Sequence, residues 1–144
     1  KNLSKQLENI KIGLFINEGI FFKLFVGYNF PYLQDFTIEY LNMKRLKKEF
    51  IDRLPKHTRL NIRECEIEVI ESDSFSNMQQ LTSLDLSENR IWLIEKNAFS
   101  QLKNLETLNL RNNRLTKFDR NLIGLGNSVE VNIEKNNIND VKMH

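Results

Sequence analysis

The chain has 144 residues, 40% of them hydrophobic, which is the size and composition of one folded domain. Its formal net charge of +2 at pH 7 gives no electrostatic case for a nucleic-acid partner or an acidic membrane surface. The sequence has no apolar run close to the roughly 20 residues that span a bilayer, no phosphate-binding loop, and no His and Cys at metal-ligand spacing. We therefore predict no membrane insertion, no metal, no cofactor and no enzymatic activity.

The N-terminal residues 1–32 follow the pattern of the later residues only loosely. Residues 1–9 resemble the second half of a repeat, and Asn2 opens an Asn-Leu-Ser triplet that is a candidate glycosylation site. Aromatic side chains crowd the segment 10–32, at Phe15, Phe21, Phe22, Phe25, Tyr28, Phe30 and Tyr32. We predict a divergent N-terminal repeat or cap over residues 1–32, which covers the apolar end of the repeats; an exposed apolar contact surface is the alternative.

Regular repeats fill residues 33–144. The clearest copy, residues 81–104, reads LTSLDLSENRIWLIEKNAFSQLKN, and Asn89 anchors a frame of apolar residues at fixed distances on both sides of it. The frame recurs around six anchor positions, spaced 24, 24, 24, 24 and 23 residues apart: Asn17, Leu41, Cys65, Asn89, Asn113 and Asn136. Self-similarity at this period is typical of a solenoid, in which each repeat packs on its neighbours.

This frame resembles that of leucine-rich-repeat proteins. The repeat length and the segments DSFS at 73–76 and NAFS at 97–100 are similar to the extracellular class, and residues 36–91 are similar in texture to secreted insect immune proteins of the mosquito complement-like pathway. The resemblance implies an α/β fold, a curved solenoid with a short parallel concave sheet and with loops, 3₁₀ turns or short helices on its convex side. It also implies a secreted, extracellular protein of innate immunity.

The physical reading of each repeat is independent of that resemblance. Successive side chains of a strand alternate between its two faces, so the two apolar strand residues point inward. The anchor asparagine can bond to backbone groups that the following turn leaves unpaired, which predicts a ladder of stacked asparagines. Leu41 and Cys65 interrupt this ladder, so we expect water or neighbouring backbone to satisfy those groups, at roughly 1–3 kcal/mol for any left unpaired. Cys65 is expected to be a small buried hydrophobe.

Outward-pointing side chains form polar columns across the predicted concave sheet, with charges of both signs. Such a surface suits a protein partner better than a small apolar ligand. The candidate partner-binding residues are Tyr40, Arg63, Asp85, Arg90, Arg111 and Arg114. Residues one repeat apart are lateral neighbours, which predicts the ion pairs Lys44–Glu68, Lys47–Glu71, Glu39–Arg63 and Glu66–Arg90. Trp92, at the edge of the sheet, is either packed there or exposed as an interface anchor.

The sequence thus predicts a non-catalytic module that recognises a protein partner through its concave face. One alternative is a structural module that forms a homodimer through its open ends or through the segment 10–32, and another is a heparin or glycan site at the basic run 44–48. The last repeat begins near residue 128 and stops before its convex segment, which is compatible with a longer protein or with a partner over that end. The single cysteine excludes an intramolecular disulfide and leaves the compartment open, and any signal peptide is expected to be already removed.

Overall fold

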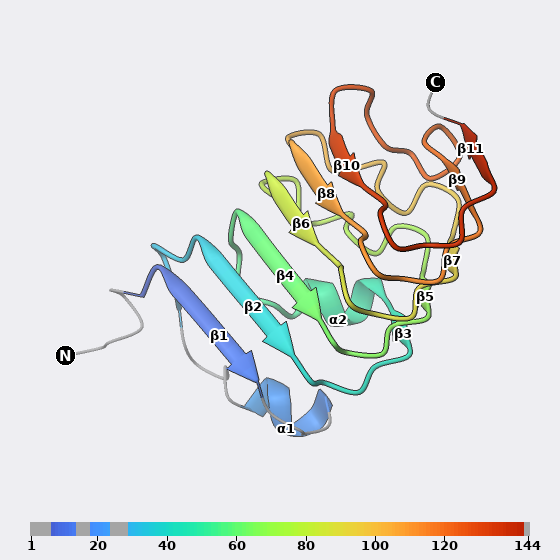
Figure 1. Ribbon diagram of the computed structural model, residues 1–144. Helices are drawn as coiled ribbons and strands as arrows, with labels where there is room; N and C mark the ends of the chain where they lie inside the picture. Colours follow the sequence, from blue (N-terminus) through green and yellow to red (C-terminus); the bar gives the residue numbers. More distant parts are fainter. Residues whose placement is uncertain (1–6, 14–17, 24–28, 143–144) are drawn as a thin grey trace.

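The computed structural model describes residues 7–13, 18–23 and 29–142, with the backbone alone at 18 and 140–142, and Figure 1 shows them as a stack of similar turns. Six short strands form the main sheet in the order β1-β2-β4-β6-β8-β10. These strands are β1 (Asn9–Gly13), β2 (Asp35–Glu39), β4 (Arg59–Arg63), β6 (Ser83–Asp85), β8 (Thr107–Asn109) and β10 (Glu130–Asn132). All neighbouring strands are parallel, so the predicted solenoid with a short parallel sheet is confirmed.

The register of the main sheet keeps equivalent residues of successive repeats side by side. Leu60 lies opposite Phe36 on one side and Leu84 on the other, and Leu108 lies opposite Leu84. The last pairing joins Leu108 to Val131, one residue closer in sequence, because the intervening repeat is shorter. A shift of one residue would turn a strand's apolar side chains to solvent, so the buried column fixes this register.

The opposite side of the turns carries two smaller parallel sheets. One has the order β3-β5-β7 and the other pairs β11 with β9. Their strands are β3 (Arg45–Leu46), β5 (Val69–Ile70), β7 (Leu93–Ile94), β9 (Lys117–Asp119) and β11 (Asp140–Lys142). β7 and β9 belong to successive repeats but are not hydrogen-bonded neighbours, so this layer is interrupted between them. The rest of the convex side consists of turns and the helix α2 (Lys48–Asp52).

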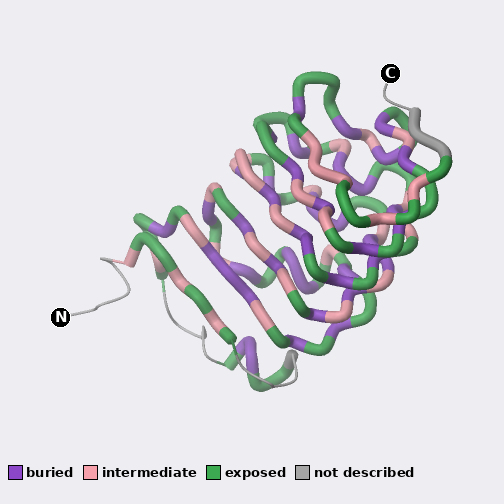
Figure 2. The backbone as a smooth tube through the Cα atoms, viewed as in Figure 1, coloured by how far each residue is buried: buried purple, intermediate pink, exposed green. Residues whose placement is uncertain are grey.

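The core lies between these layers and continues from turn to turn, as the buried positions in Figure 2 show. The inward strand residues Phe36, Ile38, Leu60 and Ile62 have no exposed surface. On the convex side the rings of Phe75 and of its counterpart one repeat later, residue 99, have centroids 5.8 Å apart. The aromatic residue of the convex segment is therefore part of the repeated core.

The N-terminal helix α1 (Glu18–Lys23) packs on the first turns. Its buried Phe21 and Phe22 meet edge to face with centroids 5.1 Å apart, and Phe21 stacks on Phe50 of α2 at 5.7 Å. The boundary at residue 32 stays a prediction, and Tyr32 itself is 65% exposed. The candidates Asn2 and Asn17, and the aromatic residues at 15, 25 and 28, fall outside the described residues. None of the described helices has the length and apolar character that a membrane crossing requires.

Candidate functional site

The concave face is built from the outward residues of the main sheet, which the in-phase register arranges in columns. In one column Asn61 of β4 donates from Nδ2 to Thr37 Oγ1 of β2 at 3.0 Å. Further along the same column, Asp85 Oδ1 accepts from the backbone N–H of Ser87 at 2.9 Å. Asn109 and Asn132 make the same contact with the residue two positions on, each at 3.0 Å. Asp85 therefore also stabilises the turn that ends its strand.

Ion pairs cross the N-terminal half of this face. Glu39 Oε1 lies 3.3 Å from Lys11 Nζ and 3.2 Å from Arg63 Nη2, so one carboxylate joins three strands. Arg59 Nη2 donates to Asp35 Oδ2 at 2.7 Å, and this hydrogen bond lowers the pKa of the Asp35 carboxyl below its usual 3.8. Of the candidate partner-binding residues, Arg63 is therefore already paired with a carboxylate of the neighbouring strand, that of Glu39.

The C-terminal half of the concave face holds an open hollow of about 730 Å³ over β4, β6, β8 and β10. Its outward lining residues are Asn61, Ser83, Asp85, Thr107, Asn109, Glu130, Asn132 and Glu134. Arg111, another candidate, lies at its margin and pairs with Glu134 of the next repeat. The lining itself contains three carboxylates and no lysine or arginine.

A ridge of left-handed residues follows the ends of the concave strands. The residue before each of the five described anchors has a positive φ: Tyr40 (64°), Glu64 (53°), Glu88 (58°), Asn112 (58°) and Lys135 (55°). These turns are linked from repeat to repeat by backbone bonds, such as Tyr40 N to Glu64 O at 3.2 Å and Glu64 N to Glu88 O at 2.9 Å. The charge of Glu64 raises the pKa of the exposed Tyr40 phenol above its usual 10.

The six candidates do not form a single cluster. Asp85 and Arg63 lie on strands of the concave sheet, and Arg111 lies two residues after the end of β8. Tyr40 and Arg90 line a separate hollow along the ridge, where Arg90 Nη2 lies 3.2 Å from Glu66 Oε1. Arg114 is exposed on the far side of its anchor, where the chain turns toward β9.

The predicted asparagine ladder is present in the described repeats. Asn113 Nδ2 donates to Leu86 O and to Leu110 O at 3.0 Å each, and its Oδ1 accepts from Ile91 N at 3.0 Å. Asn89 and Asn136 bond in the same way, one repeat before and after. Each amide therefore ties its own turn to the preceding one, which is a structural role. Leu41 and Cys65, the two other described anchors, are 1% and 0% exposed.

Most of the predicted lateral ion pairs are present. Lys44 Nζ lies 3.7 Å from Glu68 Oε2, and the pairs of Arg63 with Glu39 and of Arg90 with Glu66 are given above. The predicted Lys47–Glu71 pair is wrong, because Glu71 Oε2 instead accepts from Arg45 Nε at 2.6 Å. Arg45 starts β3 and also lies 3.2 Å from Glu95, two repeats further on, so its longer guanidinium side chain spans three turns. Lys44 and Arg45 of the basic run 44–48 are therefore paired with carboxylates of the following repeats.

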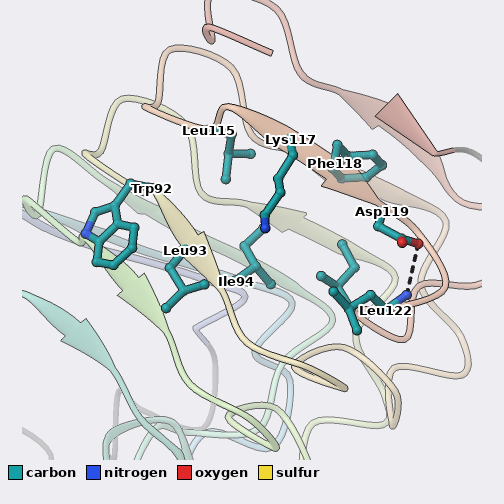
Figure 3. A pocket seen from close by; sticks show the side chains of 9 residues that line it. Trp92, Leu93, Ile94, Leu115, Lys117, Phe118, Asp119 and Leu122 are labelled. Carbon is teal, nitrogen blue, oxygen red and sulfur yellow. Dashed lines mark hydrogen bonds between the residues drawn. The ribbon is translucent and has the colours of Figure 1, made fainter. Parts of the chain in front are cut away.

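A second candidate site lies on the flank, meaning the layer of the two smaller sheets, at the interruption between β7 and β9. Figure 3 shows side chains from both strands around a pocket of about 210 Å³, whose apolar lining is Leu93, Ile94, Leu115, Phe118 and Ile123. Trp92 and Leu122 also line it and are 55% and 47% exposed. Trp92 is thus an exposed residue. The sequence singles out Trp92 but not the pocket, because the repeat frame gives no sign that these two strands fail to pair.

Within the described part of the chain, no three His, Cys, Asp or Glu side chains lie close enough to hold a metal ion. His57 is buried, 2% exposed, and its ring stacks on Phe36 with centroids 5.5 Å apart. Burial raises the pKa of the Cys65 thiol to about 11, so this sulfur is a poor nucleophile near neutral pH. Both residues are held in the core rather than at an accessible surface.

Comparison with known proteins agrees with this architecture. The chain matches the leucine rich repeat family model at residues 31–91, 55–115 and 79–138. Among solved structures, it is similar to the crystal structure of a TLR13–ssRNA13 complex, with 22% sequence identity and a TM-score of 0.47. That match covers 76% of this chain and only 22% of the other, so the chain spans about a fifth of that protein's length. No curated protein sequence matches the chain. Because the family model matches most of its residues, the chain belongs to the leucine-rich-repeat family.

Proposed function

We propose that this chain is a protein-recognition module that binds a protein partner through its concave face. The observation that carries the proposal is the open polar hollow of about 730 Å³ over four neighbouring strands. Small-molecule sites typically bury most of their ligand in a largely apolar cleft. This surface is instead open and lined by amides, hydroxyls and carboxylates, which suits the polar face of another protein.

The charges of the concave face set the kind of partner. The hollow is lined by Asp85, Glu130 and Glu134 without a lysine or arginine. The other half of the sheet carries Lys11 and Arg63 around Glu39. We therefore expect a partner that presents side chains of both signs to the concave face, including an acidic group near Arg111, which pairs with Glu134 at the margin of the hollow. Such complementarity gives specificity and speeds association more than it adds affinity.

The setting belongs to the same proposal. We place the protein outside the cell, in innate immunity, on the strength of the 24-residue repeat and the segments 73–76 and 97–100, which resemble the extracellular class and secreted insect immune proteins. We propose a non-catalytic role, because Arg63 and Arg111 already serve ion pairs and Asp85 already serves a turn. That nucleic acid is not a partner stays a prediction from the small net charge.

The test is affinity capture from extracellular fluid of the source, read by mass spectrometry, with matched variants. The first variant is Arg63→Glu/Arg111→Glu, which reverses two concave charges. The second is Thr107→Arg, which fills the hollow without breaking an ion pair. The control is Lys96→Glu/Lys103→Glu, the same charge change at two exposed residues between β7 and β8. Circular dichroism and thermal unfolding establish that every variant is folded.

A protein retained by the wild type and the control, and lost by both concave variants, is the expected result. Equal capture by all four proteins would overturn the concave face as the binding surface. Recovery of this chain alone would replace the proposal with the self-associating module, which sedimentation of the wild type would then show as a dimer.

A further inference from the structure

A further hollow, here called the return hollow, lies where the chain comes back from the convex side, just before β2 and β4 begin. Its volume is about 440 Å³, and two segments one repeat apart form it. Its lining residues are Asn29, Phe30, Pro31, Arg53, Leu54, Pro55 and Lys56. None of them lines the hollow of the concave face, so the two surfaces are separate.

The return hollow carries two positive charges and no negative one. Arg53 and Lys56 are exposed and are its only ionisable lining residues. Neither forms an ion pair with a residue that the structure describes. Asp52, which precedes Arg53, is engaged elsewhere, because its carboxylate pairs with Lys48 and accepts from Asn77 Nδ2 at 3.1 Å. The positive charge of this hollow is therefore uncompensated within the described part of the chain.

This situation differs from that of other arginines in the same repeats. Three of them are paired with carboxylates of adjacent turns, namely Arg45, Arg59 and Arg63. The lateral spacing that supplies those partners supplies none to the return hollow, whose lining has no Asp or Glu.

Both cationic groups are held in place by neighbouring elements. Arg53 Cζ lies 3.7 Å from the centre of the Phe22 ring of α1, a cation–π contact that does not use the N–H donors of the guanidinium group. Lys56 Nζ donates to the backbone carbonyl of Asn77, which occupies one of the three donors of an ammonium group. The two cations are thus positioned from within the fold and keep donors for an anion.

The rest of the lining determines which kind of anion fits. Phe30, Pro31, Leu54 and Pro55 are apolar, and the Asn29 amide is the one other polar side chain of the lining. A polyanion such as a nucleic acid engages many cations along its backbone. Two cations among apolar side chains instead match a single carboxylate that is carried next to an apolar group, since arginine and lysine both bind carboxylates by charge-assisted hydrogen bonds.

We propose that the return hollow binds an acidic side chain of a partner protein. Arg53 and Lys56 supply the donors for its carboxylate, and an apolar residue beside it in the partner's sequence packs on Phe30 and Pro31. Because this surface lies outside the concave face, it is a second and independent point of recognition.

The experiment selects random short peptides displayed on phage, in parallel on the immobilised wild-type protein and on Arg53→Gln/Lys56→Gln. Enriched peptides are synthesised with their acidic residues and with the corresponding amides, and are titrated against both proteins and the single variants. The controls are Lys103→Gln, which removes one exposed charge outside the hollow, and Thr107→Arg on the concave face. Circular dichroism establishes that each variant is folded, and Lys56→Gln leaves the Arg53–Phe22 contact intact.

We expect peptides that are enriched only on the wild type to carry Asp or Glu beside an apolar residue. Arg53→Gln and Lys56→Gln should each weaken their binding about two- to fivefold, as for exposed ion pairs, and both controls should bind as the wild type does. Changing the acid of the peptide to its amide should weaken binding to the wild type and have no effect on the double variant. In nuclear magnetic resonance titrations, the backbone amide signals of Asn29, Arg53 and Lys56 should shift.

The proposal is overturned if no acidic peptide is enriched, or if the amide form of a peptide binds the wild type equally well. Peptides that Thr107→Arg loses and the double variant retains would support the concave face and overturn this second site. Peptides that the double variant loses and Thr107→Arg retains would support it, whatever the outcome of the test of the concave face.

Discussion

The anchor residue determines how the backbone of each turn finds its hydrogen-bond partners. At position 89 the amide serves both sides, since Nδ2 donates to Ile62 O at 2.8 Å and Oδ1 accepts from Cys65 N at 3.0 Å. At position 65 the thiol lies 3.8 Å from Ile38 O, and Met43 N turns to the carbonyl of Cys65 at 3.0 Å. Neighbouring backbone therefore replaces part of the ladder, as expected, and the Cys65 thiol offers Ile38 O only a weak donor.

We predict that Cys65→Asn stabilises the fold by about 1 kcal/mol, because a strong amide donor would reach Ile38 O. Asn113→Ala should instead destabilise it by at least about 2 kcal/mol, because it leaves Leu86 O, Leu110 O and Ile91 N without their partner. Denaturant unfolding of both variants beside the wild type measures these changes. A loss of stability in Cys65→Asn as large as that in Asn113→Ala would contradict the ladder interpretation.

His57 occupies a position at which the neighbouring repeats have leucine, at Leu33, Leu81 and Leu105. Its imidazole is buried, which lowers its pKa from 6.5 to about 4. Its Nδ1 contacts Pro55 O, and its Nε2 has no partner in the described structure. A neutral histidine is therefore accommodated in an apolar site that a charged one would disrupt.

We predict a stability change with pH that is specific to His57. Because the folded-state pKa is lower than that of the unfolded chain, the stabilisation is complete above about pH 6.5 and is lost as the pH falls toward 4, by about 3 kcal/mol in total. The measurement is the free energy of unfolding of the wild type and of His57→Leu between these pH values. The difference between the two proteins should change over this range, and parallel curves would refute the assignment.

At the scale of one element, the convex loop after β9 belongs to the repeat that is one residue shorter than the others. The atoms of this loop are closely packed. Arg120 is 5% exposed and donates from Nη1 to Val129 O at 3.1 Å, across the loop. Gly124 has a φ of +77°, and a Cβ built there would lie 2.9 Å from Ser100 Cβ and 3.0 Å from Ser100 Cα. The backbone of this segment thus lies directly against the preceding repeat, which its glycine permits.

Gly124→Ala should destabilise the protein by about 1–3 kcal/mol, because it combines a left-handed backbone with a steric clash against backbone atoms. The matched control is Gly126→Ala in the same loop, where the nearest atom to an added Cβ is Val129 Cγ2 at 3.8 Å and no positive φ is required. Thermal unfolding compares the two. Equal effects of both substitutions would show that the loop, rather than this close approach, is the sensitive feature.

The whole molecule is held together by contacts between successive turns. Each inner strand of the main sheet has two paired neighbours, whereas β1 and β10 have one each. The flank adds a further weak point, because its layer is interrupted between β7 and β9. Stability in such an array is close to a sum of repeats and their interfaces, so it need not be uniform along the chain.

We predict a gradient of amide hydrogen-exchange protection along the solenoid. The backbone N–H groups of β4 and β6 should exchange slowest, those of β1 and β10 faster, because the outer strands open without breaking two interfaces. Exchange measured by mass spectrometry at peptide resolution tests this. Protection of β1 equal to that of β4 would indicate a single cooperative unit instead of a graded stack.

The sequence alone determined the architecture and most of the structural positions. An apolar frame that repeats every 24 residues can be buried only if equivalent residues stack in phase, and this physical constraint fixed the sheet register, the asparagine ladder and the burial of Cys65. Three of the four lateral ion pairs follow from the same spacing. The candidate binding residues could be placed on the surface by this logic, but their role as a site stays a prediction.

Only the tertiary structure decided features that depend on how neighbouring turns fit together. Because of the lengths and directions of the side chains, Glu71 forms its ion pair with Arg45 instead of with Lys47. The separation of β7 from β9, and with it the pocket beside Trp92, has no counterpart in the repeat frame, because that frame records which residues are buried and not how closely two adjacent strands approach. Periodicity specifies the core and the columns of the concave face, whereas the pocket between β7 and β9 arises from a departure from it.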